Sequence, residues 1–194
     1  MLKRAILMSN FVEAAIAFCE EANIGYHLGD EGTDLRGVLY CRSGIHHLLV
    51  HESGDYGMVT VFAGPKVPIK SKAAVAELLA RLSSCTGKVR LEFDYDEGVI
   101  SARATCALPE YGDVQPDAIC QLIRNAANTM GFFLPVFMAV AFGGIPPTRA
   151  LDAWERDMSG DLDNESDDDD KGRKTIRIQL PPKRNDDQDG QSDD

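Results

Sequence analysis

Residues 93–110 read FDYDEGVISARATCALPE, and this stretch decides which class of fold the chain adopts. Together with the preceding KVRLE, it alternates apolar and polar side chains on both sides of an acidic centre that contains a glycine. Because successive side chains of a strand point to opposite faces of a sheet, the pattern predicts two half-buried strands joined as a hairpin. The apolar positions are Val89, Leu91, Phe93 and Tyr95 on one side of the centre and Ile100, Ala102, Ala104 and Cys106 on the other.

The acidic centre, DYDEG, admits two interpretations, a hairpin turn and a metal-binding loop. An EF-hand loop needs oxygen ligands at positions 1, 3 and 5, glycine at position 6 and a bidentate glutamate at position 12. Counting from Asp94, position 5 is Gly98, position 6 is Val99 and position 12 is Thr105, so the motif fails at three places. Acidic residues and glycine are what turns ordinarily contain, and the sequence favours the turn.

The length of the loop sets the pairing of the two strands. A two-residue loop at Glu97 and Gly98 keeps apolar residues opposite apolar ones, with Phe93 facing Ala102. The same register places Glu92 opposite Arg103 as a cross-strand ion pair. We expect Gly98 to adopt the positive φ that such a turn requires.

The flanking sequence predicts helices on either side of further strands. Apolar residues recur at helical spacing over residues 10–24, over a segment with Ser71 as N-cap and Gly87 as stop, and from Pro116 to Gly143. Three short β-like runs, 37–42, 45–52 and 57–64, are separated by turn residues. The predicted fold is α+β, in the order α-β-β-β-α-β-β-α, with an antiparallel sheet packed by helices over residues 1–150.

The helix that follows Pro116 is apolar nearly all round in its second half. A membrane span needs about 20 apolar residues, and the run GFFLPVFMAVAFGG is shorter and contains Pro135, which should kink the helix. A helix that is apolar on every side is typically buried by two surfaces, here a sheet and a second subunit. The candidate dimer-interface or core residues are Phe132, Phe133, Val136, Phe137 and Val140.

Residues 151–194 are predicted to be a disordered acidic tail with a basic and apolar island at 171–184. The runs DLDNESDDDD and NDDQDGQSDD carry too much charge to form a core. Within the island, KTIRIQL alternates apolar with basic or polar residues, so it could add as a strand to an exposed sheet edge, and the alternative is a solvated linker. The candidate edge-pairing residues are Ile176, Ile178 and Leu180.

Composition restricts the functional classes. The formal net charge of -11 argues against nucleic acid and against an anionic membrane surface as partners, because both need clustered Lys and Arg. The five cysteines are scattered without C-x-x-C spacing, which signals neither a disulfide framework nor a zinc site and fits a reducing cytoplasm. On a strand, His47 and His51 stand about 13 Å apart, too far to share a metal. We expect no cofactor, no metal and no enzymatic activity, a thiol or metal-dependent hydrolase built from Cys41 and the histidines being the least favoured alternative.

The second half of the chain resembles YbjN-type domains of bacteria, which share the fold of type III secretion chaperones. The resemblance is carried by VPIKSKAAVAELLARLSS, by LEFDYDEGVISARATCALPE and by NTMGFFLPVFMAV, and it covers about residues 56–144. It implies a small, acidic, cytoplasmic α+β domain without enzymatic activity, often dimeric. Chaperones of this fold hold client segments on apolar patches and exposed strands, and the YbjN group is described as proposed sensory transduction regulators.

These observations lead to two functional hypotheses. The first is a homodimeric binding module that recognises a protein client through apolar surface and strand addition. The second is a signalling regulator that acts through its acidic tail, whose contacts would weaken with salt whereas apolar capture would not.

Overall fold

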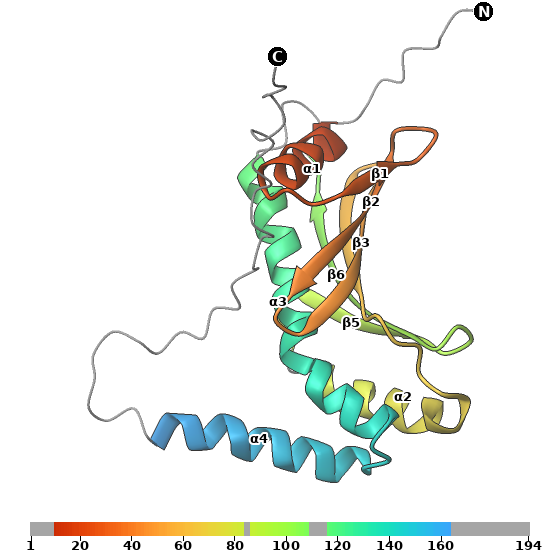
Figure 1. The fold of residues 1–194 in the computed structure, drawn as a ribbon, viewed down its shortest axis with the longest axis vertical. Helices are drawn as coiled ribbons and strands as arrows, with labels where there is room; N and C mark the ends of the chain where they lie inside the picture. The colour runs from red at the N-terminus through yellow and green to blue at the C-terminus, as the bar shows by residue number, and fades with distance from the viewer. Residues whose placement is uncertain (1–9, 84–85, 109–115, 164–194) are drawn as a thin grey trace, which may run out of the picture.

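The computed structural model describes residues 10–83, 86–108 and 116–163, with the side chains of the last helix described as far as residue 157. In this part of the chain, four helices accompany a six-stranded sheet (Figure 1). The helices are α1 (Asn10–Glu21), α2 (Lys72–Leu82), α3 (Pro116–Ala141) and α4 (Pro147–Asp163), and a short 3-10 helix, η1 (Ile69–Ser71), precedes α2. The strands are β1 (Tyr26–Leu28), β2 (Asp34–Cys41), β3 (Gly44–Ser53), β4 (Tyr56–Phe62), β5 (Val89–Asp94) and β6 (Val99–Ala107).

The sheet has the strand order β1-β2-β3-β4-β6-β5, and every neighbouring pair is antiparallel. The α+β class and the antiparallel sheet predicted from the sequence are therefore confirmed. The expected order lacked β1, a strand of three residues whose side chains are largely exposed, so its sequence carries no apolar alternation.

One face of the sheet forms the core together with the helices. Paired residues share a face, and the buried hydrophobic residues of β2, β3, β4 and β6 all lie on this face, whereas the buried polar residues Thr60 and Ser101 lie on the other one. Helices α1 and α3 pack there: the Phe11 ring of α1 lies against Gly57 of β4, where a Cβ atom would meet the ring. The largest fully buried side chains include Phe11, Leu35, Leu39, Leu48, Leu78, Ile100, Ile123, Met130 and Phe137.

The β5–β6 hairpin confirms the turn interpretation and corrects its length. Asp94 pairs with Val99, so the loop contains four residues rather than two, and Phe93 faces Ile100. The carboxylate of Asp94 accepts a hydrogen bond from the Glu97 N–H at 2.9 Å, so the loop begins after Asp94, two residues earlier than the sequence suggested. The register therefore shifts by two residues, which keeps apolar residues opposite apolar ones.

Two further expectations for the hairpin are confirmed in substance. Gly98 has a φ of 71°, and its N–H donates to the Asp94 carbonyl at 2.8 Å. The ion pair between Arg103 and Glu92 is present at 2.9 Å. It is diagonal, because Glu92 lies directly opposite Ser101 in the observed register.

Helix α2 begins and ends differently from the prediction. Ser71 occupies the N-cap position but its side chain makes no capping hydrogen bond, and its backbone is helical with a φ of -103° and a ψ of -6°. The hydroxyl instead donates to the Ala141 carbonyl at the end of α3, at 2.7 Å. The helix ends at Leu82, before the expected stop at Gly87, and the hydroxyl of Ser83 donates to the Ala80 carbonyl at 2.8 Å.

Helix α3 is continuous through Pro135, and its axis changes direction along its length in Figure 1. It ends as expected at the glycine pair, where Gly144 takes a φ of 66°. Proline 147 then begins a new helix, since a proline fits the first helical position.

Helix α4 corrects the expected boundary at residue 150. Residues 151–163 continue α4 instead of beginning the tail. The reason is tertiary: Ala150 is buried, Leu151 and Trp154 are half-buried, and the Trp154 ring lies 5.1 Å from that of Phe132 and 5.2 Å from that of Phe133. Three apolar residues in an acidic segment suffice once α3 offers them an aromatic surface.

Candidate functional site

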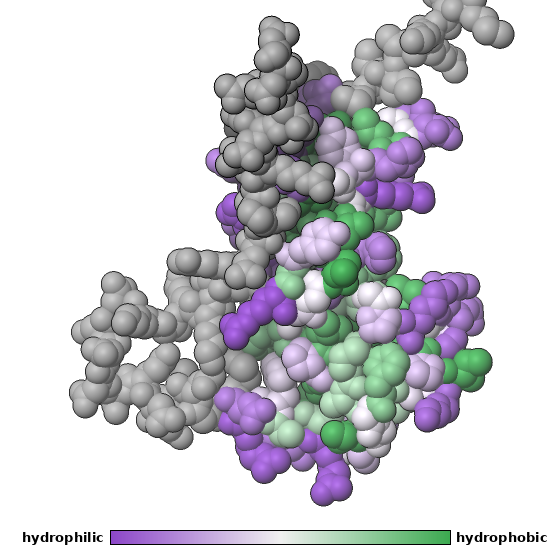
Figure 2. Space-filling view, in the orientation of Figure 1, coloured by the Kyte–Doolittle hydropathy of each residue, from purple (hydrophilic) through white to green (hydrophobic). Residues whose placement is uncertain are grey.

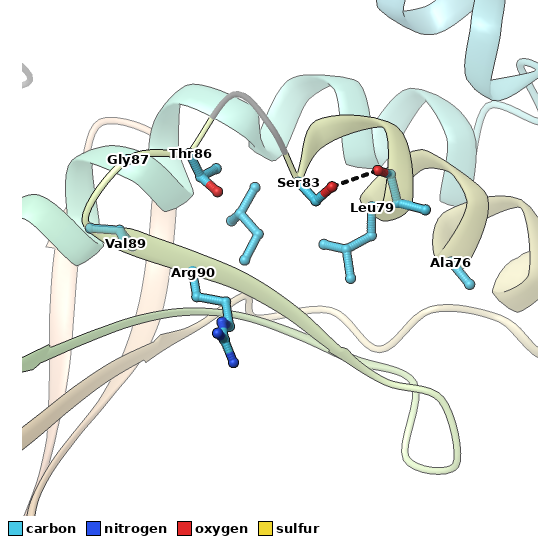
Figure 3. Close-up of a pocket in the computed structure, with 9 residues that line it drawn as sticks. Ala76, Leu79, Ser83, Thr86, Gly87, Val89 and Arg90 are labelled. Atoms are coloured by element: carbon cyan, nitrogen blue, oxygen red, sulfur yellow. Dashed lines mark hydrogen bonds between the residues drawn. The ribbon is translucent and has the colours of Figure 1, made fainter.

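A groove of about 500 Å³ lies between helix α2 and the beginning of strand β5. Figure 3 shows α2 on one side of it and β5 on the other, with Leu79 directed from the helix toward the strand. Ligand pockets in proteins commonly measure about 300–1,000 Å³, so the groove has room for several side chains of a bound molecule. Its lining residues are Ala76, Leu79, Ala80, Ser83, Thr86, Gly87, Val89, Arg90 and Leu91.

The apolar walls follow from the periodicities of the two elements. On α2, Val75, Leu78 and Leu82 are buried in the core, while Leu79 lies next to that stripe and is only half-buried. On β5, Val89 and Leu91 face the helices, and Arg90 between them faces the other side of the sheet. The apolar stripe of α2 is thus wider than the three residues that it buries in the core, and Leu79, the additional residue, lines the groove.

Strand β5 is an edge strand, and this gives the groove a second recognition element. In the sheet, β5 pairs with β6 on one side and ends the strand order on the other. An edge strand presents a row of backbone N–H and C=O groups that can pair with an added strand. A segment lying along this edge would direct every second side chain toward α2 and the groove.

The charges around β5 differ between its two ends. Asp94, Asp96 and Glu97 are exposed at the hairpin end, whereas Lys88 and Arg90 are exposed where the strand begins. Such a gradient distinguishes the two possible directions of a bound charged segment.

The hairpin turn is tied to the connection that leads into α2. The Val67 N–H donates to the Gly98 carbonyl at 2.8 Å, and the ammonium of Lys72 donates to the Asp96 carbonyl at 2.7 Å. An ion pair between Lys66 and Glu97 at 2.8 Å spans the same two segments, although both groups are largely exposed and contribute little. These contacts hold the edge strand and the helix as the two fixed walls of one groove.

A second group of exposed apolar side chains, here called the corner, lies in the second half of α3 and in the α3–α4 connection. Phe132 is 40% exposed, Phe142 50% and Ile145 42%. In Figure 2 the lower part of the visible face, over α2, α3 and α4, carries much of the green surface, with purple residues around its rim. The far face of the sheet adds Tyr40 and Ile45, a cross-strand pair of which each member is 56% exposed.

The interface residues expected from the sequence fall into two groups. Four of them, Phe133, Val136, Phe137 and Val140, are at most 4% exposed and belong to the core of the same chain. Their burial has a simple cause, because α3 packs against the sheet, α1, α2 and α4 at once. Phe132 alone among the five offers surface to a partner. The candidate edge-pairing residues Ile176, Ile178 and Leu180 lie outside the described residues.

The groups considered for catalysis have environments typical of structural residues. Burial raises the pKa of the Cys41 thiol, the opposite of the lowered pKa that a nucleophilic thiolate needs. His46 is 1% exposed, and its Nε2 lies 2.8 Å from the Ser43 hydroxyl, so it joins the turn between β2 and β3. Within residues 10–83, 86–108 and 116–163, we find no cluster of three His, Cys, Asp or Glu side chains that could hold a metal ion. Over the same residues, no helix is long and apolar enough to cross a membrane.

Comparison with solved structures gives a likeness of fold. No family model and no curated protein matches the chain. A search of solved structures finds YbjN. The match is to the crystal structure of YbjN from E. coli, described as a proposed transcription regulator, with a TM-score of 0.48 and 9% sequence identity. The match covers 66% of this chain and 89% of the YbjN chain, and YbjN-type domains are the group that the sequence resembles.

The groove is the feature that sequence reasoning missed. The sequence signal for the groove is Leu79, an apolar residue of α2 that follows the buried core residue Leu78 and so widens the apolar stripe of the helix. The other half of the groove has no local signal, because the sequence of β5 reads the same whether the strand is central or at an edge.

Proposed function

We propose that this protein is a non-enzymatic binding module that holds an extended protein segment along the edge of β5, with alternate side chains in the groove against α2. The observation that carries the proposal is the juxtaposition of the sheet's edge strand with a groove on its helix-facing side, in which Leu79, Val89 and Leu91 stand among polar residues. Strand addition supplies backbone hydrogen bonds, and pockets for every second side chain supply selectivity.

The lining sets the chemistry of the favoured partner. Leu79, Val89 and Leu91 offer aliphatic contact, so two or three aliphatic side chains at alternate positions would fit. Each such side chain contributes about 1.5–3 kcal/mol on full burial, from which the cost of ordering the segment must be subtracted. The intervening side chains would lie beside Arg90 and Glu92 on the other face, where polar or charged residues are favoured.

We also propose that two copies associate through the corner formed by Phe132, Phe142 and Ile145. The support for this is the exposure of these three large apolar side chains, Phe132 in the second half of α3, where its ring packs against Trp154, and Phe142 and Ile145 in the α3–α4 connection. An exposed apolar patch of this kind is typical of an interaction site.

The proposed function is tested by screening a displayed library of random peptides on the full chain. Selected peptides should share an apolar residue at every second position. The substitution Ala80→Arg should abolish their binding, because Ala80 lines the groove and is exposed. Ala73→Arg is the matched control, since Ala73 is an exposed residue of the same helix outside the groove lining. Selected peptides that bind both variants equally would remove the groove from the function.

A further inference from the structure

We infer that the groove has a resident occupant, the chain's own segment Lys174–Leu180, which pairs antiparallel with β5 and must be displaced by a client. This inference rests on the proposed function. The segment reads KTIRIQL, so it presents Ile176, Ile178 and Leu180 to one side and Thr175, Arg177 and Gln179 to the other. It has the alternation that the lining of the groove requires.

One antiparallel register pairs the whole of β5 with the segment and satisfies both faces of the strand. When Ile178 lies opposite Leu91, Ile176 lies opposite Phe93 and Leu180 opposite Val89. All three apolar side chains then point toward the helix layer, beside the groove. Proline residues follow immediately after Leu180 and end the pairing, because a proline has no N–H to donate.

The polar face of the same register matches charges. Arg177 lies opposite Glu92 and Gln179 opposite Arg90. The basic residues 171–174, which include Lys171, Arg173 and Lys174, approach the acidic hairpin end of β5, with Asp94 and Asp96. A parallel arrangement with Ile178 opposite Leu91 would instead place Arg177 against Arg90, and like charges directly opposite each other are unfavourable.

The length of chain outside the described structure sets how far the segment can reach. Helix α4 starts beside α2 and is 17 residues long, which corresponds to about 25 Å. The eleven residues 164–174 that follow can span at most about 36–40 Å. A chain that returns along α4 therefore still has about 11–15 Å left to reach the edge of β5.

The consequence is a competition between the attached segment and any client. A segment tethered by a short linker acts at an effective concentration on the order of millimolar, so the free groove is available only to a stronger or more abundant ligand. The basic and apolar island would then regulate the binding module.

The test uses the full chain and a labelled synthetic peptide of residues 171–184. We expect the variant Ile178→Asp to bind the peptide at least about tenfold more tightly than the unmodified chain, because its own segment no longer competes. Asn185→Asp, which adds the same charge just outside the segment, should bind like the unmodified chain. Adding Ala80→Arg to Ile178→Asp should abolish the binding, whereas adding Ala73→Arg should leave it unchanged. Hydrogen exchange at residues 89–94 should be faster in Ile178→Asp than in the unmodified chain.

Four results would overturn the inference. Equal binding of the peptide by the unmodified chain and by Ile178→Asp would mean that the attached segment does not compete. If dilution of the unmodified chain restores its binding of the peptide, the competing segment comes from a second copy of the chain. If Ile178→Asp binds library peptides through the groove but not the 171–184 peptide, the groove binds extended segments, but residues 174–180 are not its occupant. If it binds neither, the proposed function itself is wrong.

Discussion

Removing the Ser71 hydroxyl should destabilise the fold through a tertiary contact and not through the loss of a helix cap. Ser71 is 7% exposed, and its hydroxyl donates to the Ala141 carbonyl at 2.7 Å. That carbonyl is among the last of α3, which have no N–H partner within the helix. In Ser71→Ala the carbonyl stays buried without its donor, so we expect the free energy of unfolding to fall by about 1–3 kcal/mol.

Ser71→Asp separates the two explanations. An aspartate would serve well as an N-cap, so a capping role predicts that stability is kept or increased. The observed geometry predicts a larger loss than for Ser71→Ala, because a carboxylate cannot donate to the Ala141 carbonyl and would be buried against it.

The assay is urea unfolding followed by circular dichroism, with the midpoints compared at constant slope. Ser83→Ala is the control, since Ser83 makes its hydrogen bond to Ala80 at the exposed end of the same helix, and we expect a change within about 0.5 kcal/mol. A Ser71→Asp variant as stable as the unmodified chain would refute the tertiary explanation.

Three other predictions concern the core, the turn and pH. Phe137→Asp should unfold the chain, because Phe137 is fully buried. Phe132→Asp should stay folded, because Phe132 is 40% exposed, and light scattering should show a monomer. A dimeric Phe132→Asp variant would exclude the corner as the interface. Gly98→Ala should lower the melting temperature, since φ is 71° and its Cβ would lie 2.8 Å from the Val67 carbonyl, while Gly87→Ala, with open space around it, should be neutral or slightly stabilising. Burial lowers the pKa of His46 below its value in the unfolded chain, so the unfolded state binds more protons. The free energy of unfolding should therefore fall as the pH drops below about 6.5. Urea titrations in which His46→Gln shows the same pH dependence would disprove this.

The sequence predicted those features of the fold that depend on neighbours along the chain. The parity of the β5–β6 hairpin and the positive φ of Gly98 were correct, because alternation and turn chemistry are local. The size of the loop was wrong by two residues, since a four-residue loop has the same parity as a two-residue one. The Asp94 carboxylate, by accepting the Glu97 N–H, selects the longer loop.

Helix α4 shows where composition misleads. Its segment is acidic and has few apolar residues, so the sequence alone favours a tail. The rings of Phe132 and Phe133, about 20 residues earlier in the chain, give Trp154 a surface to pack on. That surface exists only once α3 has folded.

The sequence alone predicts the periodicities, the turn at DYDEG, the helix stop at Gly143 and Gly144 and the apolar alternation of KTIRIQL. Each of these is set by the conformational preferences of a few adjacent residues. Tertiary packing makes β5 an edge strand, leaves Leu79 lining a groove beside the core, and brings the Ser71 hydroxyl to the Ala141 carbonyl, 70 residues away in the chain. These features depend on which elements come to lie side by side, and that choice is made by packing over the whole chain.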